Sequence, residues 1–319
     1  MRPYYIISGG KIQRSNDTII VIKEDGNYEI PVENADSISI IGNTTLTSSV
    51  LSLLSEKGIP LFLFSYYGKY ITSILPENYI QSGYVLIKQV EAYLNKERRL
   101  EFARDFIFGC AENYNKILKK FKLEKISISY NEIKKMESIE GLMGYEGNIA
   151  NEYFKKIDKI LPDKFKINKR ERKPPTNYTN AMISFTNMLL YSTIASEIFS
   201  THLNPTISYL HEPGFRRNSL SLDIAEIFKP LFSHSVVFTL IRKKEINEED
   251  FIEENGIFLN EKGKRKIIEE FDKKLQETYY VSSIKRKISH KHLIRLELYK
   301  IERAIIENKK YVPFKPRRW

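Results

Sequence analysis

The sequence is short of cysteine and of long apolar runs, and each shortage excludes a class of protein. Cys110 is the only cysteine in 319 residues, so no intrachain disulfide can form and a reducing compartment is expected. Its place beside Ile107 and Tyr114 in an apolar stretch predicts an inert side chain packed in the core. The densest apolar run, residues 59–67, is too short to span a bilayer, and the N-terminus lacks a signal-peptide pattern. We therefore expect a soluble, cytoplasmic protein.

Negative charge is also in short supply. Lysine and arginine together number 51 against 40 for aspartate and glutamate, which gives a formal net charge of +11. A balance of this size favours a polyanionic partner, and nucleic acid is the natural candidate. The densest basic cluster lies just before Pro174, and its candidate phosphate contacts are Lys166, Lys169, Arg170 and Arg172. Any basic cluster taken singly is explained as well by solvated surface, whereas together they suit phosphate contacts.

The pattern of apolar and turn residues changes once along the chain. Residues 1–77 hold short β-branched runs separated by turn residues, with a short helix expected from Thr47 to Glu56. After Pro76, apolar residues recur at helical spacing. The sequence therefore predicts an α+β protein. A small N-terminal β-rich domain (1–77) and a linker (78–86) precede a larger, mostly α-helical catalytic domain (87–319).

Glu146 is a carboxylate on an otherwise apolar helix face. The positions three, four and seven residues away include Leu142, Met143, Ile149 and Tyr153. This spacing places Glu146 on the stripe that faces the core. An unpartnered carboxylate is costly there, so we expect a cation or strong hydrogen-bond donors beside it. Gly144 and Gly147 flank Glu146, and glycines at such positions allow another backbone or a ligand to come close.

A second polar group follows about sixty residues later in the chain, beginning with His211. A loop follows this histidine, and a helix is then expected between a polar cap at residue 218 or 219 and Pro230. On that helix Asp223 and Glu226 lie three positions apart and project together. Carboxylates and an imidazole, brought together, form a hard-cation site of the kind that activates phosphodiester chemistry.

Each of these residues also has a plain structural explanation. Glu146 can belong to a buried salt bridge, and His211 can be satisfied within the core or a loop. Asp223 can complement the helix dipole in the first turn, and Glu226 can lie on a solvated face. Spacing alone does not bring residue 146 to residue 226. Two further histidines, His290 and His292, have a metal-like spacing but stand close to Lys287 and Lys291, so a surface position or a phosphate contact is expected for them rather than a metal site.

The order of motifs along the chain favours the functional interpretation. Gly-x-Glu-Gly stands at residues 144–147 and Asn-Ala-x-x-Ser-Phe at residues 180–185. A histidine and a basic loop then precede Ser-Leu-x-x-Asp-x-x-Glu at residues 219–226, followed by Lys229 and a proline. In this order the motifs resemble the CRISPR-associated protein one family, the integrases of CRISPR adaptation. The family commonly has arginine where this chain has Lys229, which keeps the charge but loses bidentate phosphate geometry.

The resemblance implies a metal-dependent DNA integrase and endonuclease. The implied catalytic residues are Glu146, His211, Asp223 and Glu226. Glu146, His211 and Glu226 would ligate Mg²⁺ or Mn²⁺ directly, with Asp223 close by as a supporting group or an alternate ligand. The 3′-hydroxyl of a short DNA fragment would attack a phosphodiester at the CRISPR repeat boundary.

The resemblance also implies partners. They are double-stranded DNA with 3′-hydroxyl ends, a second copy of the chain paired through the N-terminal β domain, and CRISPR-associated protein two. Arg216, Arg217 and Lys229 join the basic loop as expected nucleic-acid contacts. Two rival functions remain open: a free-standing nuclease acting on branched DNA, and a non-catalytic DNA-binding scaffold whose acidic cluster is an ion-pair network.

Overall fold

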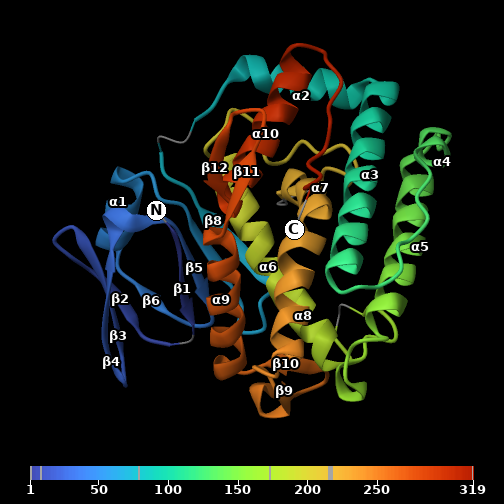
Figure 1. The fold of residues 1–319 in the computed structure, drawn as a ribbon. Helices are drawn as coiled ribbons and strands as arrows, with labels where there is room; N and C mark the ends of the chain where they lie inside the picture. Colours follow the sequence, from blue (N-terminus) through green and yellow to red (C-terminus); the bar gives the residue numbers. More distant parts are fainter. Residues whose placement is uncertain (1, 8, 78–79, 172–173, 215–217, 318) are drawn as a thin grey trace.

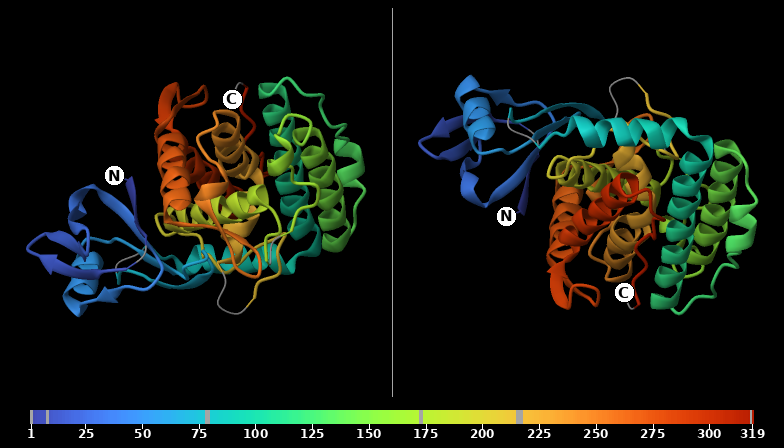
Figure 2. Two further views of the ribbon diagram at one scale, coloured as in Figure 1. Left: turned by 90° about the horizontal axis from the view of Figure 1, so that it is seen from below. Right: turned by 90° about the horizontal axis from the view of Figure 1, so that it is seen from above.

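An N-terminal β-rich part and a larger helical part make up the molecule (Figure 1), so the predicted α+β class is confirmed. The computed structural model describes residues 2–7, 9–77, 80–171, 174–214, 218–317 and 319. The two parts lie side by side, and the β-rich part projects from one side of the helices in all three views (Figure 2).

Two four-stranded sheets form the N-terminal part. The first has the order β1-β5-β7-β8, and all its pairs are parallel except β7 with β8. Its strands are β1 (Arg2–Ile7), β5 (Ala35–Ile41), β7 (Leu61–Phe64) and β8 (Tyr70–Ile74). The second has the order β4-β3-β2-β6. Its strands are β2 (Lys11–Ser15), β3 (Thr18–Lys23), β4 (Gly26–Pro31) and β6 (Thr45–Leu46).

The helix predicted from Thr47 to Glu56 is present as α1 (Ser48–Glu56), with Thr47 at its N-cap position. The buried side chains of α1 belong to a small core formed by the N-terminal part. Because side chains alternate along a strand, β7 serves two cores. Leu61 lies in the small core, whereas Phe62 and Phe64 lie in the main core of the helical part. Apolar packing therefore joins the two parts of the chain.

The helical part begins at Gly83, inside the segment 78–86 predicted as a linker, and the domain boundaries themselves remain a prediction. Its helices are α2 (Gly83–Leu94), α3 (Lys96–Lys120), α4 (Tyr130–Lys134), α5 (Ile139–Ile157), α6 (Tyr178–Ile198), α7 (Ser219–Phe228), α8 (Ser235–Arg242), α9 (Glu261–Gln276) and α10 (His290–Ile306). Two short hairpins pair β9 (Phe251–Glu253) with β10 (Ile257–Leu259), and β11 (Thr278–Val281) with β12 (Arg286–Ser289).

Helix α6 occupies the centre of the helical part, where its side chains are buried on nearly every face. It packs against α7, α8, α9 and α10. Helix α3 packs against α5 and α7, and Figure 1 shows α3 and α5 on one side of α7 with α9 and α10 on the other. Residues far apart in the sequence can therefore meet where α3, α5 and α7 come together.

Helix α7 ends at Phe228, just before Pro230 as predicted, but the chain continues in helical geometry beyond the proline. A π-helical segment, Pro230–His234, leads directly into α8, and such segments are frequent at functional sites. No single helix of the described ranges is long and apolar enough to cross a membrane. The pair Ser219–Phe228 and Pro230–Arg242 meets that test by length and composition only, with a bend of 52°.

Candidate metal centre

Helix α5 carries Glu146 toward the interior. Ser138 caps the helix by accepting a hydrogen bond from the backbone N–H of Gly141, at 3.1 Å. Leu142 and Ile149 are buried on the same side as Glu146, which is itself half-buried. Met143 is 45% exposed, so the apolar stripe is narrower than the sequence predicted.

The glycines beside Glu146 do not admit another backbone. A Cβ placed on Gly144 or Gly147 would meet no atom of the described residues within 4 Å. Gly147 instead lines a cavity of about 220 Å³ together with Glu146. Of the two alternatives, no backbone of the described residues lies close to these glycines, and access for a ligand stays a prediction.

Asp223 organises the turn that holds His211. Its carboxylate is fully buried and accepts the backbone N–H groups of Tyr209, Leu210 and His211 at 2.6, 3.0 and 2.9 Å. The Nδ1 of His211 lies 2.8 Å from the same carboxylate. A carboxylate only accepts, so Nδ1 carries the proton. Nε2 then points toward Glu226, whose nearer oxygen is 3.9 Å away.

Charge and burial act in opposite directions on His211. Burial lowers the pKa of the imidazole, but the hydrogen bond and charge of Asp223, together with the charge of Glu226, outweigh burial and raise the pKa above its ordinary value. Both oxygens of Asp223 are engaged in these four hydrogen bonds. This arrangement favours a supporting role for Asp223 over direct ligation.

Glu226 lies on the buried side of α7, with 6% of its surface exposed. One of its oxygens accepts a hydrogen bond from Nζ of Lys229 at 2.5 Å. Lys229 is also buried, and burial by itself lowers the pKa of its ammonium group. The charge of Glu226 outweighs that penalty and raises the pKa. The ammonium group lies 5.6 Å from the ring centre of Tyr191.

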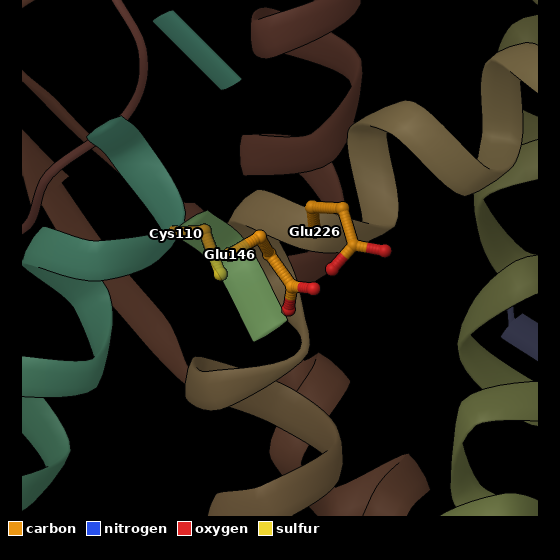
Figure 3. A group of neighbouring side chains, drawn as sticks. All are labelled: Cys110, Glu146 and Glu226. Carbon is orange, nitrogen blue, oxygen red and sulfur yellow. The ribbon is translucent and has the colours of Figure 1, made fainter. Parts of the chain in front are cut away.

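Glu146 and Glu226 lie beside a third potential metal ligand that the sequence did not predict. The Sγ of Cys110 and one carboxylate oxygen from each glutamate lie within 4.8 Å of one another (Figure 3). Three helices, α3, α5 and α7, each supply one of these atoms. Cys110 is fully buried within the main core, as predicted, and its sulfur also faces two carboxylates, which the sequence did not indicate. Burial, and then the charges of Glu226 and Glu146, raise the pKa of the thiol.

The cavity beside this cluster brings in residues that sequence reasoning missed. Asn187 of α6 and His234 of the π-helical segment line it, together with Tyr114 of α3. Asn187 is 9% exposed, and its Oδ1 has no hydrogen-bond partner among the described residues. The spacing of these residues in the sequence did not identify them as site residues. For Asn187 the reason is that α6 is buried on most of its faces, so burial does not single out one position.

Arg99 on α3 also holds the turn that contains His211. Its Nε donates to the backbone carbonyl of Tyr209 at 3.0 Å, and its Nη2 donates to the carboxylate of Glu212. These two partners, Tyr209 and Glu212, lie on either side of Leu210 and His211. No signal in the sequence linked Arg99 to this turn.

The residues predicted to contact nucleic acid separate into groups. Arg170 lines the cavity, and its guanidinium donates to Asn180 Oδ1 and Ser184 Oγ of α6, each at 3.0 Å. Lys229 lies at the cluster itself. Lys166 is paired with Asp163 at 2.6 Å, and Lys169 is exposed. Arg172, Arg216 and Arg217 lie outside the described residues.

The surface position expected for His290 is wrong. His290 is 4% exposed and stacks on Trp319 with ring centres 4.3 Å apart. Burial, and then the charge of Lys274, lower the pKa of the imidazole to about 4. The neighbouring lysines mislead at this position because one of them, Lys291, turns toward Asp36 and Glu197 instead.

A comparison with known proteins identifies the family. The family model described as CRISPR associated protein Cas1 matches residues 4–273. The chain belongs to the Cas1 family. Its sequence is 41% identical to CRISPR-associated protein Cas1 1 of Methanobrevibacter ruminantium, over 98% of this chain and 97% of that protein. It is 44% identical to the CRISPR-associated endonuclease Cas1 of Methanothermobacter thermautotrophicus, over 98% of this chain and 94% of that protein.

Solved structures agree with this assignment. A Cas1 protein from Thermotoga maritima has a TM-score of 0.88 to this chain at 38% identity, covering 96% of this chain and 97% of that one. A casposase bound to an integration product has a TM-score of 0.90 at 21% identity, covering 100% and 94%, a likeness that shows the fold alone. The predicted family and enzyme class are confirmed: this Cas1 chain is a CRISPR-associated endonuclease.

Proposed function

We propose that this Cas1 chain inserts short DNA fragments into a CRISPR array at a metal centre held by Glu146, His211 and Glu226. The observation that carries the proposal is the meeting of the Glu146 and Glu226 carboxylates beside a cavity of about 220 Å³, with Nε2 of His211 3.9 Å from Glu226. His211 is not within 4.8 Å of both carboxylates, so its side chain would have to approach Glu146 to complete the centre. Asp223 supports it by fixing the tautomer that leaves Nε2 free of a proton in the neutral ring. A carboxylate that hydrogen-bonds the far nitrogen of a metal-ligating histidine is a recurring arrangement.

The donor atoms suit a hard divalent cation. Carboxylate oxygens with one imidazole fit Mg²⁺ or Mn²⁺, and a cation would offset the cost of keeping two carboxylates close together. A bound ion would supply Lewis-acid stabilisation to the phosphate under attack. The chain's own contribution is to hold Glu146 and Glu226 on two packed helices and His211 in the turn that Asp223 fixes.

The reaction is a transesterification. The 3′-oxygen of the fragment forms a bond to phosphorus and its hydroxyl proton passes to solvent. The bond between phosphorus and the 3′-oxygen of the repeat strand breaks, and that oxygen takes up a proton from solvent to leave as a hydroxyl. No covalent protein intermediate is needed. Lys229 and Arg170 stand at the cavity and can contact phosphate oxygens. Lys229 would have to turn from Glu226 to do so, whereas Arg170 is already held by Asn180 and Ser184.

The proposed partners are double-stranded DNA with 3′-hydroxyl ends and CRISPR-associated protein two, in the cytoplasm. The net charge of +11 supports a DNA partner. Structures that share the fold include a Cas1–DNA complex, with a TM-score of 0.60, and a complex that contains Cas1 and Cas2, with a TM-score of 0.80.

We also propose that residues 1–77 form a dimerisation domain, linked through 78–86 to the catalytic domain 87–319. The support is the exposed apolar side chains of the edge strand β8, namely Tyr70, Ile71 and Ile74. Exposed apolar side chains on an edge strand suit an interface with a second copy of the chain.

The test is an integration assay. The purified protein, with and without its candidate partner, is incubated with a labelled 3′-hydroxyl fragment and supercoiled repeat DNA, with and without Mn²⁺. We expect label to enter the repeat DNA only with Mn²⁺, and the rate to fall by at least about a hundredfold in Glu226→Gln, a transition-state loss of roughly 3 kcal/mol. Glu245→Gln, at an exposed glutamate, is the control and should keep the full rate.

The same assay separates the rival functions. Cleavage of branched DNA without any transfer of label would favour a free-standing nuclease. Binding of DNA with no metal-dependent product of either kind would favour a scaffold. In that case Glu226→Gln would change the melting temperature and nothing else.

A further inference from the structure

The chain's single cysteine lies within 4.8 Å of both acidic residues of the proposed metal centre. Figure 3 shows the sulfur of Cys110 beside the carboxylate of Glu146, with the carboxylate of Glu226 next to them. Cys110 packs within the main apolar core, and its sulfur lies in addition beside two carboxylates. Sulfur and carboxylate oxygen can both ligate a metal ion, so the three groups are placed where one ion could contact them all.

A second observation at the same cavity also points to a cation. Asn187 lines the cavity, is more than nine-tenths buried, and has an Oδ1 with no hydrogen-bond partner within the described part of the chain. A buried amide oxygen without a donor is costly. It can be satisfied only by a donor or a positive ion, and Glu146 and Glu226 line the same cavity.

We propose that Cys110 is a sulfur ligand that lets the centre take up a thiophilic divalent ion, such as Zn²⁺, on Cys110, Glu146 and Glu226. This inference rests on the proposed metal centre and adds a second class of ion to it. Hard ions such as Mg²⁺ prefer oxygen donors and leave the thiol protonated, whereas softer ions bind thiolate. The centre would then exchange between a hard ion on Glu146, His211 and Glu226 and a thiophilic ion that also engages sulfur.

The geometry is close to what such an ion needs. Zinc binds sulfur at about 2.3 Å and carboxylate oxygen at about 2.0–2.2 Å, so donors around a tetrahedral ion stand roughly 3.4–3.6 Å apart. The three donor atoms lie within 4.8 Å of one another, so no pair has to approach by more than about 1.4 Å, which side-chain rotation can supply. On binding, the S–H bond breaks, the sulfur keeps the electron pair as thiolate, and the proton passes to water.

An ion held in this way would block the enzyme. Affinity for divalent ions rises toward the end of the first transition series, so Zn²⁺ held by thiolate competes well against Mn²⁺. Occupation by Zn²⁺ would draw Glu146 and Glu226 away from the arrangement proposed for Mn²⁺ and Mg²⁺. The consequence is inhibition by zinc that excess Mn²⁺ reverses.

Cobalt gives the test a readout that does not depend on activity. Co²⁺ replaces Zn²⁺ at such sites, and a cobalt–thiolate bond produces a charge-transfer absorption band in the near ultraviolet. Cys110 is the only cysteine, so the band can have no other source in the chain. The full-length protein, Cys110→Ala and Cys110→Ser are each titrated with Co²⁺. Their Zn²⁺ and Mn²⁺ affinities are then measured by equilibrium dialysis, with melting curves to confirm folding.

We expect the wild-type protein to develop the band at one equivalent of Co²⁺, and both variants to bind Co²⁺ without it. Loss of the sulfur ligand should weaken Zn²⁺ binding by roughly a hundredfold or more, at or above the usual range for groups that only support a ligand. Mn²⁺ affinity should change much less. Two variants are used so that a folding defect in one does not decide the outcome.

Three results would overturn the inference: no Co²⁺ uptake, uptake of one equivalent without the band, or equal Zn²⁺ affinity in wild type and Cys110→Ala. Failure of the proposed function would look different. A band that disappears in Cys110→Ala, in a protein whose integration rate is unaffected by Glu226→Gln, would uphold the sulfur ligand and reject the catalytic assignment.

Discussion

Replacing Asp223 with asparagine disturbs the centre in a way that the structure specifies closely. One oxygen of Asp223 accepts the backbone N–H and the ring Nδ1–H of His211, and the other accepts the backbone N–H groups of Tyr209 and Leu210. Asparagine keeps the shape, but one of its two terminal atoms is an NH₂ group that only donates. In either orientation of the amide, its NH₂ group faces two N–H groups and can accept a hydrogen bond from neither. Two hydrogen bonds are therefore lost in a fully buried place.

The magnitude follows from those lost contacts. Hydrogen bonds to charged groups contribute about 1.5–3 kcal/mol each, so two cost about 3–6 kcal/mol if the turn stays in place. The turn can reduce this cost by moving, or His211 can shift its proton to Nε2. Either change spoils the proposed ligand, so strand transfer should fall by about a hundredfold, the upper end of what loss of a supporting group usually costs.

The assay combines strand-transfer rates with ¹⁵N NMR of the histidine rings, which reports the tautomer and the pKa of His211. In wild type the proton should reside on Nδ1, and Asp223→Asn should lower the pKa. Asp250→Asn is the matched control, because Asp250 is equally buried and accepts the backbone N–H of Asn247 at 2.9 Å, yet lies outside the cavity. A rate within threefold of wild type, with Nδ1 still protonated, would refute the reasoning.

Three further outcomes follow. The folded-state pKa of His290, about 4, lies below its ordinary value of 6.5, so the unfolded chain binds the proton more readily. The contribution of His290 to the free energy of unfolding should therefore be full above about pH 6.5 and fall by about 3 kcal/mol as the pH drops toward 4. Urea unfolding across this range measures the direction of the change, and His290→Gln should lose this pH dependence. Arg170→Ala should lower both DNA affinity and strand transfer, whereas Lys169→Ala should lower only affinity, by less than about tenfold; equal losses of strand transfer would show that the cavity position of Arg170 has no special role. Arg99→Ala should weaken Mn²⁺ binding about ten- to a hundredfold by loosening the turn before His211, measured by dialysis, and unchanged affinity would rule this out.

The acidic centre could be predicted from the sequence because the types of its residues and the order of their motifs can both be read there. Glu146 on an apolar stripe, and Asp223 three residues before Glu226, are local patterns, and the resemblance of the motifs connected them. Helix α1 could also be predicted from the sequence, since local periodicity and its end signals define it. The pairing of β1 with β5, and of β5 with β7, was not, because parallel strands are brought together by contacts between distant segments.

Cys110 shows where sequence reasoning stops. Helical spacing indicated correctly that its side chain turns inward. It did not indicate which part of the interior the sulfur reaches, because that depends on how α3 packs against α5 and α7. Arg170 is a similar case. Its neighbours in the sequence are also basic, and only the hydrogen bonds to Asn180 and Ser184 distinguish it from Lys169.

The most direct test of the central claim is the position of manganese in crystals of the protein. Diffraction data collected at the manganese absorption edge locate the ion without reference to activity. We predict one anomalous peak at ordinary ligand distances, about 2.0–2.3 Å, from a carboxylate oxygen of Glu146, Nε2 of His211 and a carboxylate oxygen of Glu226. A peak elsewhere, or these three side chains remaining more than about 5 Å from any ion at saturating Mn²⁺, would contradict the account.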